Sequence, residues 1–158
     1  FWIFDKSCLR RMFSAATLRR RMTMKVHDLH GFVTYRLPEG IIRTEAKPGV
    51  DIVLGFAIEN SLVVNELCRG RKHPLLIDLK NLKSITPPAR AYFSARDRES
   101  DICAFAFLIH SAFQRMVGNI FIQFNNPPVP TRLFTDEAVA LAWLRTHIPL
   151  PKSAVRPA

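Results

Sequence analysis

Eight consecutive apolar residues, ICAFAFLI at positions 102–109, constrain the fold of this chain more than any other feature. The run is too short to span a bilayer, which takes about 20 residues, but it has the length of a strand. A half-buried strand alternates polar and apolar residues, whereas a strand without alternation is covered on both faces. Burial of both faces is typical of a strand in the middle of an α/β layer. The sequence therefore predicts a sheet with helices packed on it.

Further strands and helices alternate along the chain around this run. Period-2 alternation predicts a half-buried strand over 32–37, and the turn at 38–40 predicts the returning strand of a hairpin over 41–46. A broad apolar stripe predicts a helix over 52–69 with Asp51 as its N-cap. The remaining predicted elements are a strand over 74–79, a helix from Pro88 to about 96, a helix over 112–124 capped by Ser111, a strand over 129–134 and a last helix capped by Thr135.

The predicted order is β-β-α-β-α-β-α-β-α. It indicates a single α/β domain over 24–148, with a five-stranded mixed sheet, mostly parallel, and flanking helices. In the helix over 112–124, the spacing predicts that Phe113 and Met116 face the core while Gln114 lies on the opposite, polar face.

The net charge of +10 is concentrated at the two ends of the chain. Residues 1–23 hold six basic residues and one acidic residue, and residues 149–158 hold two basic residues. The domain over 24–148 has 15 basic and 12 acidic residues. A domain so close to neutral argues against nucleic-acid binding outside the basic arm. We expect residues 149–158 to form a disordered tail.

The segment 1–23 is rich in Arg and poor in acids, and it lacks the continuous apolar core of a secretory signal. Its composition fits a mitochondrial-type presequence, an amphipathic arm that packs on a partner, or a stretch translated ahead of a natural start at Met24. A basic arm binds nucleic acid or anionic lipid, or is simply solvated. The segment is therefore either a basic N-terminal arm or a non-native extension.

No reaction-carrying motif is present. The glycine-rich phosphate motifs, GxSxG, HExxH and CxxC are all missing from the sequence. The five histidines and three cysteines lack ligand spacing, so we expect neither a metal nor a cofactor. The odd number of cysteines indicates a reducing compartment, and no apolar run is long enough for a transmembrane segment. These features predict a cytoplasmic protein without enzymatic activity.

The candidate binding residues lie at two junctions where a strand leads into a helix. Ligands of α/β sheets bind at the carboxyl ends of strands, and helix N-termini favour anions. The residues are Ser84, Thr86 and Arg90 at the first junction and His110, Ser111 and Arg115 at the second. Structural roles compete with binding for several of them, because Ser111 suits a helix cap and a lone Arg on a helix is usually solvated. Asp78 has a structural role available as acceptor of a backbone N–H from the next turn.

The passage LLIDLKNLKSITPPAR, residues 75–90, resembles the STAS domain of anti-sigma-factor antagonists. In that domain a D-L-S-x-V-x-x-I-D-S-S-G pattern follows the corresponding strand. The segments ICAFAFLI, MVGNIFIQF and PTRLFTDEAVALAWL more closely resemble a bacterial group of small, largely uncharacterised STAS-like (SpoIIAA-like) proteins. The resemblance covers about residues 30–148 and implies a STAS-like fold.

The resemblance implies a regulatory role, but this chain departs from the pattern at its switch. If Asp78 and Ile85 align with the Asp and Ile of the pattern, Thr86 replaces the second Asp and Pro87-Pro88 replace the serine pair. Proline has no hydroxyl, so the phosphorylatable serine is missing.

Two functions remain open at this point. The first is a non-catalytic regulatory or protein-interaction module that holds a protein partner or a homodimer mate. The alternative is a carrier of a small apolar or lipid-like ligand, because the related CRAL-TRIO lipid-transfer domains share this sheet arrangement.

Overall fold

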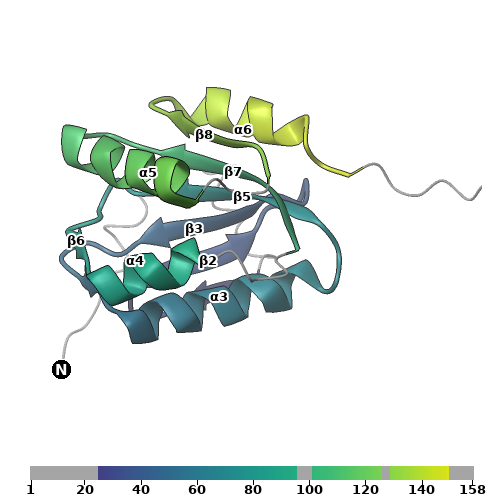
Figure 1. The fold of residues 1–158 in the computed structure, drawn as a ribbon. Coiled ribbons are helices and arrows are strands. Elements are labelled where there is room, and N and C mark those ends of the chain that lie inside the picture. Colours follow the sequence, from purple (N-terminus) through teal and green to yellow (C-terminus); the bar gives the residue numbers. More distant parts are fainter. Residues whose placement is uncertain (1–24, 96–100, 126–128, 150–158) are drawn as a thin grey trace, which may run out of the picture.

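A six-stranded sheet runs through the centre of the computed structural model, which describes residues 25–95, 101–125 and 129–149 (Figure 1). Antiparallel pairing joins the first three strands, and the last four run parallel. In spatial order the strands are β1 (Val26–Asp28), β2 (Phe32–Arg36), β3 (Ile42–Ala46), β5 (His73–Asp78), β7 (Ile102–Leu108) and β8 (Thr131–Phe134). The predicted mixed α/β sheet is confirmed, and β1 is one strand more than the sequence predicted.

Helices cover both faces of the sheet. In the described segments these are α3 (Leu54–Cys68), α4 (Pro87–Ser94), α5 (Ala112–Asn125) and α6 (Glu137–Arg145). Figure 1 shows α3, α4 and α5 on one face and α6 on the other. Side chains of β7 reach both layers, since Phe107 packs with Ala57 and Ala89 while Leu108 packs with Leu144. The prediction that this strand is covered on both faces is thus confirmed. The arm 1–23 and residues 150–158 of the predicted tail lie outside the described residues.

A second, two-stranded parallel sheet stands at one corner of the molecule, where β4 (Asp51–Ile52) pairs with β6 (Ser84–Ile85). The prediction that Asp51 caps α3 is wrong, because Asp51 belongs to β4 and the N-cap residue is Val53, which makes no side-chain cap bond. The Asp51 carboxylate instead bonds residues of the segment containing β6.

Two other predicted helix starts are shifted by one residue. The N-cap of α6 is Asp136, whose side chain accepts a hydrogen bond from Val139 N, and not Thr135. A carboxylate is favoured there because it also faces the positive end of the helix dipole. Helix α4 begins at Pro87 rather than at Pro88.

A buried polar cluster joins α3 to the hairpin of β2 and β3. Thr34 Oγ1 lies 2.9 Å from Thr44 Oγ1 and donates to Asn60 Oδ1 at 2.6 Å, and Thr44 Oγ1 lies 3.3 Å from the same amide oxygen. All three residues are buried. Buried polar groups cost free energy unless they are hydrogen-bonded, so the three side chains depend on one another.

The start of β5 holds a buried histidine. His73 Nδ1 lies 2.7 Å from the Gly40 carbonyl oxygen, which fixes Nδ1 as the donor, while His73 Nε2 is buried without a partner in the described structure. Burial lowers the pKa of His73, and the nearby charges of Arg36 and Arg71 lower it further, although the bond to Gly40 opposes them. The neutral ring is therefore the form that the fold accommodates.

Asn60→Ala is expected to destabilise the protein by about 2 kcal/mol, because two buried hydroxyls lose their shared acceptor. Urea unfolding followed by circular dichroism measures the loss. Asn65→Ala is the matched control, since Asn65 is exposed on the same helix and only its backbone carbonyl is used. Equal unfolding free energies for the two variants would contradict a supporting role of the cluster.

The free energy of unfolding is expected to fall as the pH drops below 6.5, the ordinary pKa of His73. The pKa of this ring is lower in the folded protein, so the unfolded chain takes up the proton first and gains stability from it. His73→Asn keeps a donor toward Gly40 but does not titrate. Unfolding titrations at several pH values should show a smaller decline for this variant, and an unchanged decline would refute the assignment.

Candidate functional site

The carboxyl edge of the sheet, where the four parallel strands end, carries all six predicted site residues. Each parallel strand ends at this edge and is followed in the chain by a helix, so α3, α4, α5 and α6 all begin there (Figure 1). Ser84, Thr86 and Arg90 lie at the start of α4, and the other three lie at the start of α5. Among the described residues, no hydrogen bond or ion pair links the two groups directly.

The first group is tied to the segment that precedes α3. Ser84 Oγ donates to Asp51 Oδ1 at 2.5 Å, and Lys83 Nζ lies 3.0 Å from Asp51 Oδ2. Thr86 donates both its backbone N–H and its hydroxyl to the Ile52 carbonyl, at 2.9 and 3.2 Å. The bonds from Ser84 and then Lys83 lower the pKa of the Asp51 carboxyl. Ser84 and Thr86 thus hold β6 against β4.

The start of α4 offers no free hydroxyl. Thr86 is the N-cap residue but makes no side-chain cap bond, and Pro87 and Pro88 fill the first two helical positions. The hydroxyl of Ser84 is bonded to a carboxylate, which would repel an added phosphate. The hydroxyls of Ser84 and Thr86 are therefore engaged in hydrogen bonds within the described structure.

Two residues of the second group, His110 and Ser111, form the cap of α5 together with Gln114. Gln114 N donates to Ser111 Oγ at 3.2 Å, and the Gln114 side chain accepts from His110 N and donates from Nε2 to the Lys80 carbonyl at 3.1 Å. The prediction that Ser111 caps this helix is confirmed. The bonds of Gln114 fasten the start of α5 to the loop after β5.

The predicted faces of α5 are wrong at three positions. Gln114 is 5% exposed, whereas Phe113 and Met116 are 40% and 51% exposed. The reason is the cap itself, because the glutamine turns inward to satisfy backbone groups and takes the position expected for an apolar side chain. The spacing Ser-x-x-Gln at 111–114 is a capping-box signal and could have revealed this arrangement.

A largely buried arginine, Arg43, which the sequence analysis did not single out, connects the strands to α6. Arg43 Nη2 lies 2.9 Å from Asp78 Oδ2, Arg43 Nε lies 2.7 Å from Glu45 Oε1, and Arg43 Nη1 bonds Glu137. The Arg43 side chain is only 12% exposed. Burial alone would lower the pKa of Arg43, but the bond to Glu137 and the charges of neighbouring groups, Glu45 among them, raise it on balance.

Asp78 joins this ion cluster to both junctions. Its Oδ1 accepts from Lys80 N at 2.9 Å, which is the structural role expected from the sequence, and lies 3.8 Å from His110 Nε2. Three carboxylates thus surround one guanidinium, and the His110 ring lies beside one of them, Asp78.

A groove of about 360 Å³ opens beside the second group. It is lined by Ile109, Arg115, Asn119, Leu133, Phe134, Thr135, Asp136 and Val139. Half of these side chains are polar, and Arg115 and Asp136 supply opposite charges. The groove lies at the carboxyl ends of β7 and β8, where ligands of α/β sheets bind, and no residue of α3 lines it. The residues of α3 that face the sheet are packed in the core instead.

The described segments hold no group of three His, Cys, Asp or Glu side chains placed to bind a metal ion. Cys68 is buried, and burial raises the pKa of its thiol to about 11; burial also raises the pKa of Cys103. Both thiols are therefore poor nucleophiles and behave as small apolar groups. None of the helices in the described part of the chain combines the length and the hydropathy needed to cross a bilayer.

The chain matches the model of one protein family, the Domain of unknown function (DUF7793), over residues 35–148. This match spans every strand of the parallel sheet and the whole carboxyl edge. The chain belongs to the DUF7793 family. A comparison with curated proteins found no match for this DUF7793 domain.

Two solved structures are similar to this DUF7793 domain. An uncharacterized protein of the DUF3478 family from Shewanella loihica PV-4, with a SpoIIAA-like fold, is 13% identical and has a TM-score of 0.53 over 77% of this chain and 92% of its own. A protein with unknown function from Arthrobacter sp. FB24 is 33% identical, covers 70% of this chain and 96% of its own, and has a TM-score of 0.29. The first similarity confirms the predicted SpoIIAA-like fold.

Arg43→Gln is expected to destabilise the protein by about 3 kcal/mol, because it leaves Asp78 and Glu45, which are 12% and 28% exposed, without their counter-charge. Arg145→Gln is the control, since it breaks an exposed pair with Glu39 and should cost less than about 1 kcal/mol. Urea unfolding measures both. Similar losses in the two variants would show that the cluster around Arg43 is no more important than a surface ion pair.

Proposed function

We propose that this DUF7793 domain is a non-catalytic regulatory or protein-interaction module that binds its partner, another protein or a second copy, at the carboxyl edge of the sheet. The observation that carries the proposal is the exposure of apolar side chains where the helices begin. They are Val53 and Leu54 at α3, Pro87 and Pro88 at α4, Phe113 and Met116 at α5, and Val139 at α6.

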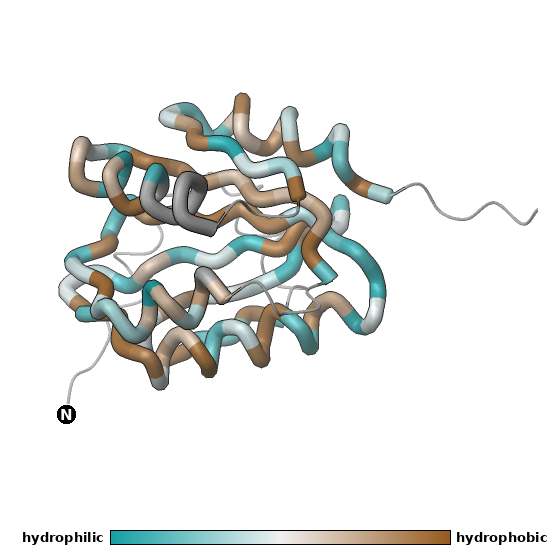
Figure 2. The backbone as a smooth tube through the Cα atoms, in the orientation of Figure 1, coloured by the Kyte–Doolittle hydropathy of each residue, from teal (hydrophilic) through white to brown (hydrophobic). Residues whose placement is uncertain are grey.

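Exposed apolar side chains gathered in one region of a soluble domain are typical of an interaction surface. Each of the four helices contributes in its first two turns, so the apolar side chains share one end of the molecule. Figure 2 shows the hydrophobic residues of α3 continuing along that helix from its first turn. Aromatic and Met side chains are enriched in protein–protein interfaces, which favours Phe113 and Met116 as the anchors.

The polar groups of the edge support a role without catalysis. The hydroxyls of Ser84 and Thr86 donate to a carboxylate and a carbonyl, and the Ser111 hydroxyl caps a helix. A hydroxyl or thiol nucleophile needs a base within hydrogen-bond distance. Among the described residues, the His110 ring lies near the Asp78 carboxylate, and no hydrogen bond joins it to a hydroxyl or thiol. The carboxyl edge therefore offers exposed apolar side chains for contact with a partner, and Arg90 and Arg115 add positive charges beside them.

The carrier alternative receives weaker support. Ligand-carrying cavities enclose most of an apolar ligand, whereas the groove next to Arg115 is open to solvent and half polar. Its size would suit a small polar molecule better than a lipid chain. The interaction module remains the better proposal.

The proposal predicts that Phe113→Gln combined with Met116→Gln weakens partner binding at least ten-fold, because truncated interface anchors cost more than about 1 kcal/mol each. A photo-crosslinking phenylalanine analogue at position 113 identifies the partner in intact cells. The control position is Leu62, which is apolar and 64% exposed but lies in the second half of α3.

A discrete adduct at position 113, with a second copy or with one other protein, is the expected result. Sedimentation velocity of the wild type and the double variant then measures the change in affinity. The same adducts at positions 113 and 62, or none at either, would overturn the proposed surface.

A further inference from the structure

The groove of about 360 Å³ between α5 and α6 holds polar side chains that the fold does not use. Arg115 and Asn119 lie four residues apart on α5, so they share one face of that helix, and both line the groove. Thr135 and Asp136 form the link between β8 and α6 and line the groove as well. All four residues are exposed to solvent, so their polar groups are accessible to a ligand.

These polar groups are also free of partners within the protein. In the described segments, no hydrogen bond or ion pair engages the side chain of Arg115, Asn119 or Thr135. Asp136 Oδ1 accepts from Val139 N at 2.9 Å, and its Oδ2 has no donor in the same segments. Arg115 and Asp136 form no ion pair with each other there, although both line the groove. The groove therefore presents one unpaired positive group and one unpaired negative group.

The more buried part of the lining is apolar. Ile109 is 3% exposed, and Leu133 packs against the core cluster to which Ile109 belongs. Phe134 packs against the other core cluster, which contains Leu144 of α6. Successive side chains of a strand point to opposite faces, so the edge strand β8 supplies apolar groups on both sides of the sheet. The groove thus combines an apolar floor with a polar rim.

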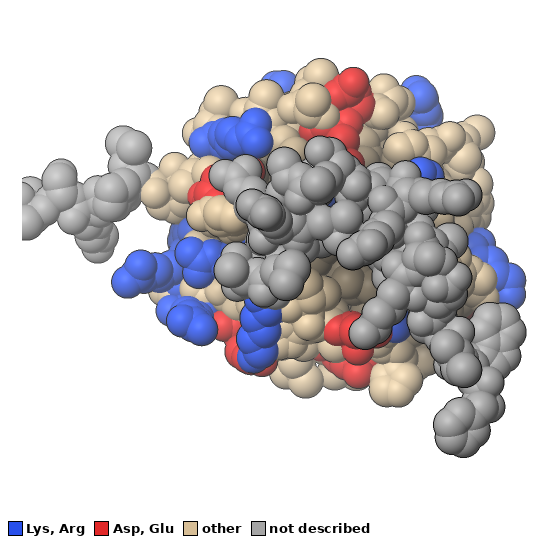
Figure 3. All heavy atoms as spheres, turned by 180° about the vertical axis from the view of Figure 1, so that it is seen from behind, with Lys and Arg blue, Asp and Glu red and all other residues tan. Residues whose placement is uncertain are grey.

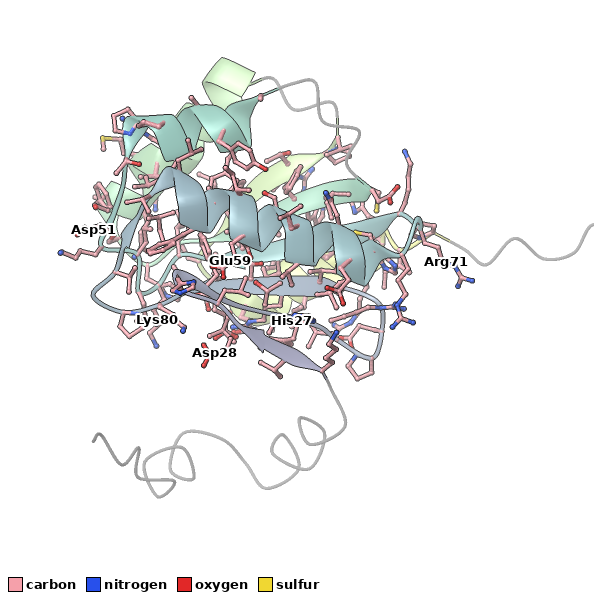
Figure 4. The ribbon with its side chains drawn as sticks, turned by 90° about the horizontal axis from the view of Figure 1, so that it is seen from below. His27, Asp28, Asp51, Glu59, Arg71 and Lys80 are labelled. Carbon is pink, nitrogen blue, oxygen red and sulfur yellow. The ribbon has the colours of Figure 1, made fainter. Side chains whose placement is uncertain are left out.

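Positive charge gathers away from the groove. Figure 3 shows Lys and Arg gathered at its left side, which is the end of the molecule that carries Arg71. Figure 4 places Arg71 at the opposite end from Asp51 and Lys80, which lie at the carboxyl edge. At the groove itself, Asp136 would repel a simple anion and Arg115 would repel a simple cation. A molecule that carries both charges is attracted by both groups.

We infer that this groove binds a small zwitterion, a free α-amino acid with an apolar side chain. The guanidinium of Arg115 is suited to a carboxylate, to which it donates two parallel hydrogen bonds, and the Asn119 amide is a further donor. Asp136 Oδ2 and the Thr135 hydroxyl accept from the ammonium group. The apolar side chain of the ligand then covers the floor of the groove, where burial of apolar surface is favourable.

The size and the lining of the groove fit this class of ligand. A volume of about 360 Å³ lies at the lower end of the range for small-molecule sites. A quaternary ammonium ligand has no N–H to donate and is bound by cages of several aromatic rings. Phe134 is the one aromatic residue of the described lining, so a primary ammonium group fits better.

Titration of the isotope-labelled full chain with L-leucine into the millimolar range, followed by heteronuclear NMR spectra, tests this inference. We expect saturable shifts of the backbone signals of residues that line the groove. Leucinamide lacks the carboxylate, and N-acetylleucine lacks the ammonium group. Each should bind about ten-fold more weakly than leucine, because each loses one charge-assisted contact.

Two variants assign the charges of the ligand to their partners. Asp136→Asn removes the negative charge but keeps an oxygen that caps α6. This variant and Arg115→Gln should each weaken leucine binding about ten-fold. Arg132→Gln is the matched control, because Arg132 is exposed on β8 but does not line the groove, and its Cζ lies 5.5 Å from the centroid of the Trp143 ring. We expect the control to change leucine binding by less than about two-fold, since exposed charges are screened.

Three results would overturn the inference. The first is the absence of saturable shifts at the groove. The second is binding of leucinamide or N-acetylleucine as tight as that of leucine, which would make the groove a site for a simple cation or a simple anion. The third is equal weakening by Arg115→Gln and Arg132→Gln. None of these results concerns Phe113 or Met116, which do not line the groove, so the proposed function would stand or fall separately.

Discussion

The ion cluster around Arg43 determines how the two layers of the domain meet at the carboxyl edge. One guanidinium bonds carboxylates from β3, β5 and α6, which are far apart in the sequence. A buried charge costs several kcal/mol unless it is paired. Asp78 and Glu45 pair the guanidinium within the sheet, and Glu137 adds a contact from the first turn of α6, so the cluster joins that helix to the strands. The position of Asp78 in the same cluster connects the layers to the start of α5.

Most of the fold follows from patterns that act over a few residues. The apolar run at 102–109 predicted a central strand, and the alternation at 32–37 predicted a half-buried one, because side-chain direction in a strand has a period of two. The strand–helix order then fixed the parallel part of the sheet. The six site residues all reached the carboxyl edge for the same reason, since each follows a parallel strand.

The features that the sequence did not reveal depend on partners distant along the chain. Strands β4 and β6 have two residues each, too few for a period, and exist because Asp51 and Ser84 meet across 33 positions. Asp51 resembles a helix cap in sequence, and only that partner changes its role. The exposure of Phe113 and Met116 likewise depends on Gln114 turning inward to reach the loop after β5. Periodicity placed Phe113 and Met116 inward and Gln114 outward, and the hydrogen bonds of Gln114 reverse that arrangement.

The polar cluster of Thr34, Thr44 and Asn60 has a consequence for how the hairpin chooses its alignment. Thr34 stands opposite Thr44 in the β2–β3 pairing. A slip by two residues would keep every side chain on its proper face, so hydrophobic burial alone does not forbid it. The slipped hairpin, however, would set the Thr34 hydroxyl against Ile42 or Ala46 and leave Asn60 with a single partner. Hydrophobic burial does not distinguish the native alignment from the slipped ones. The hydrogen bonds of the polar cluster therefore select the native alignment.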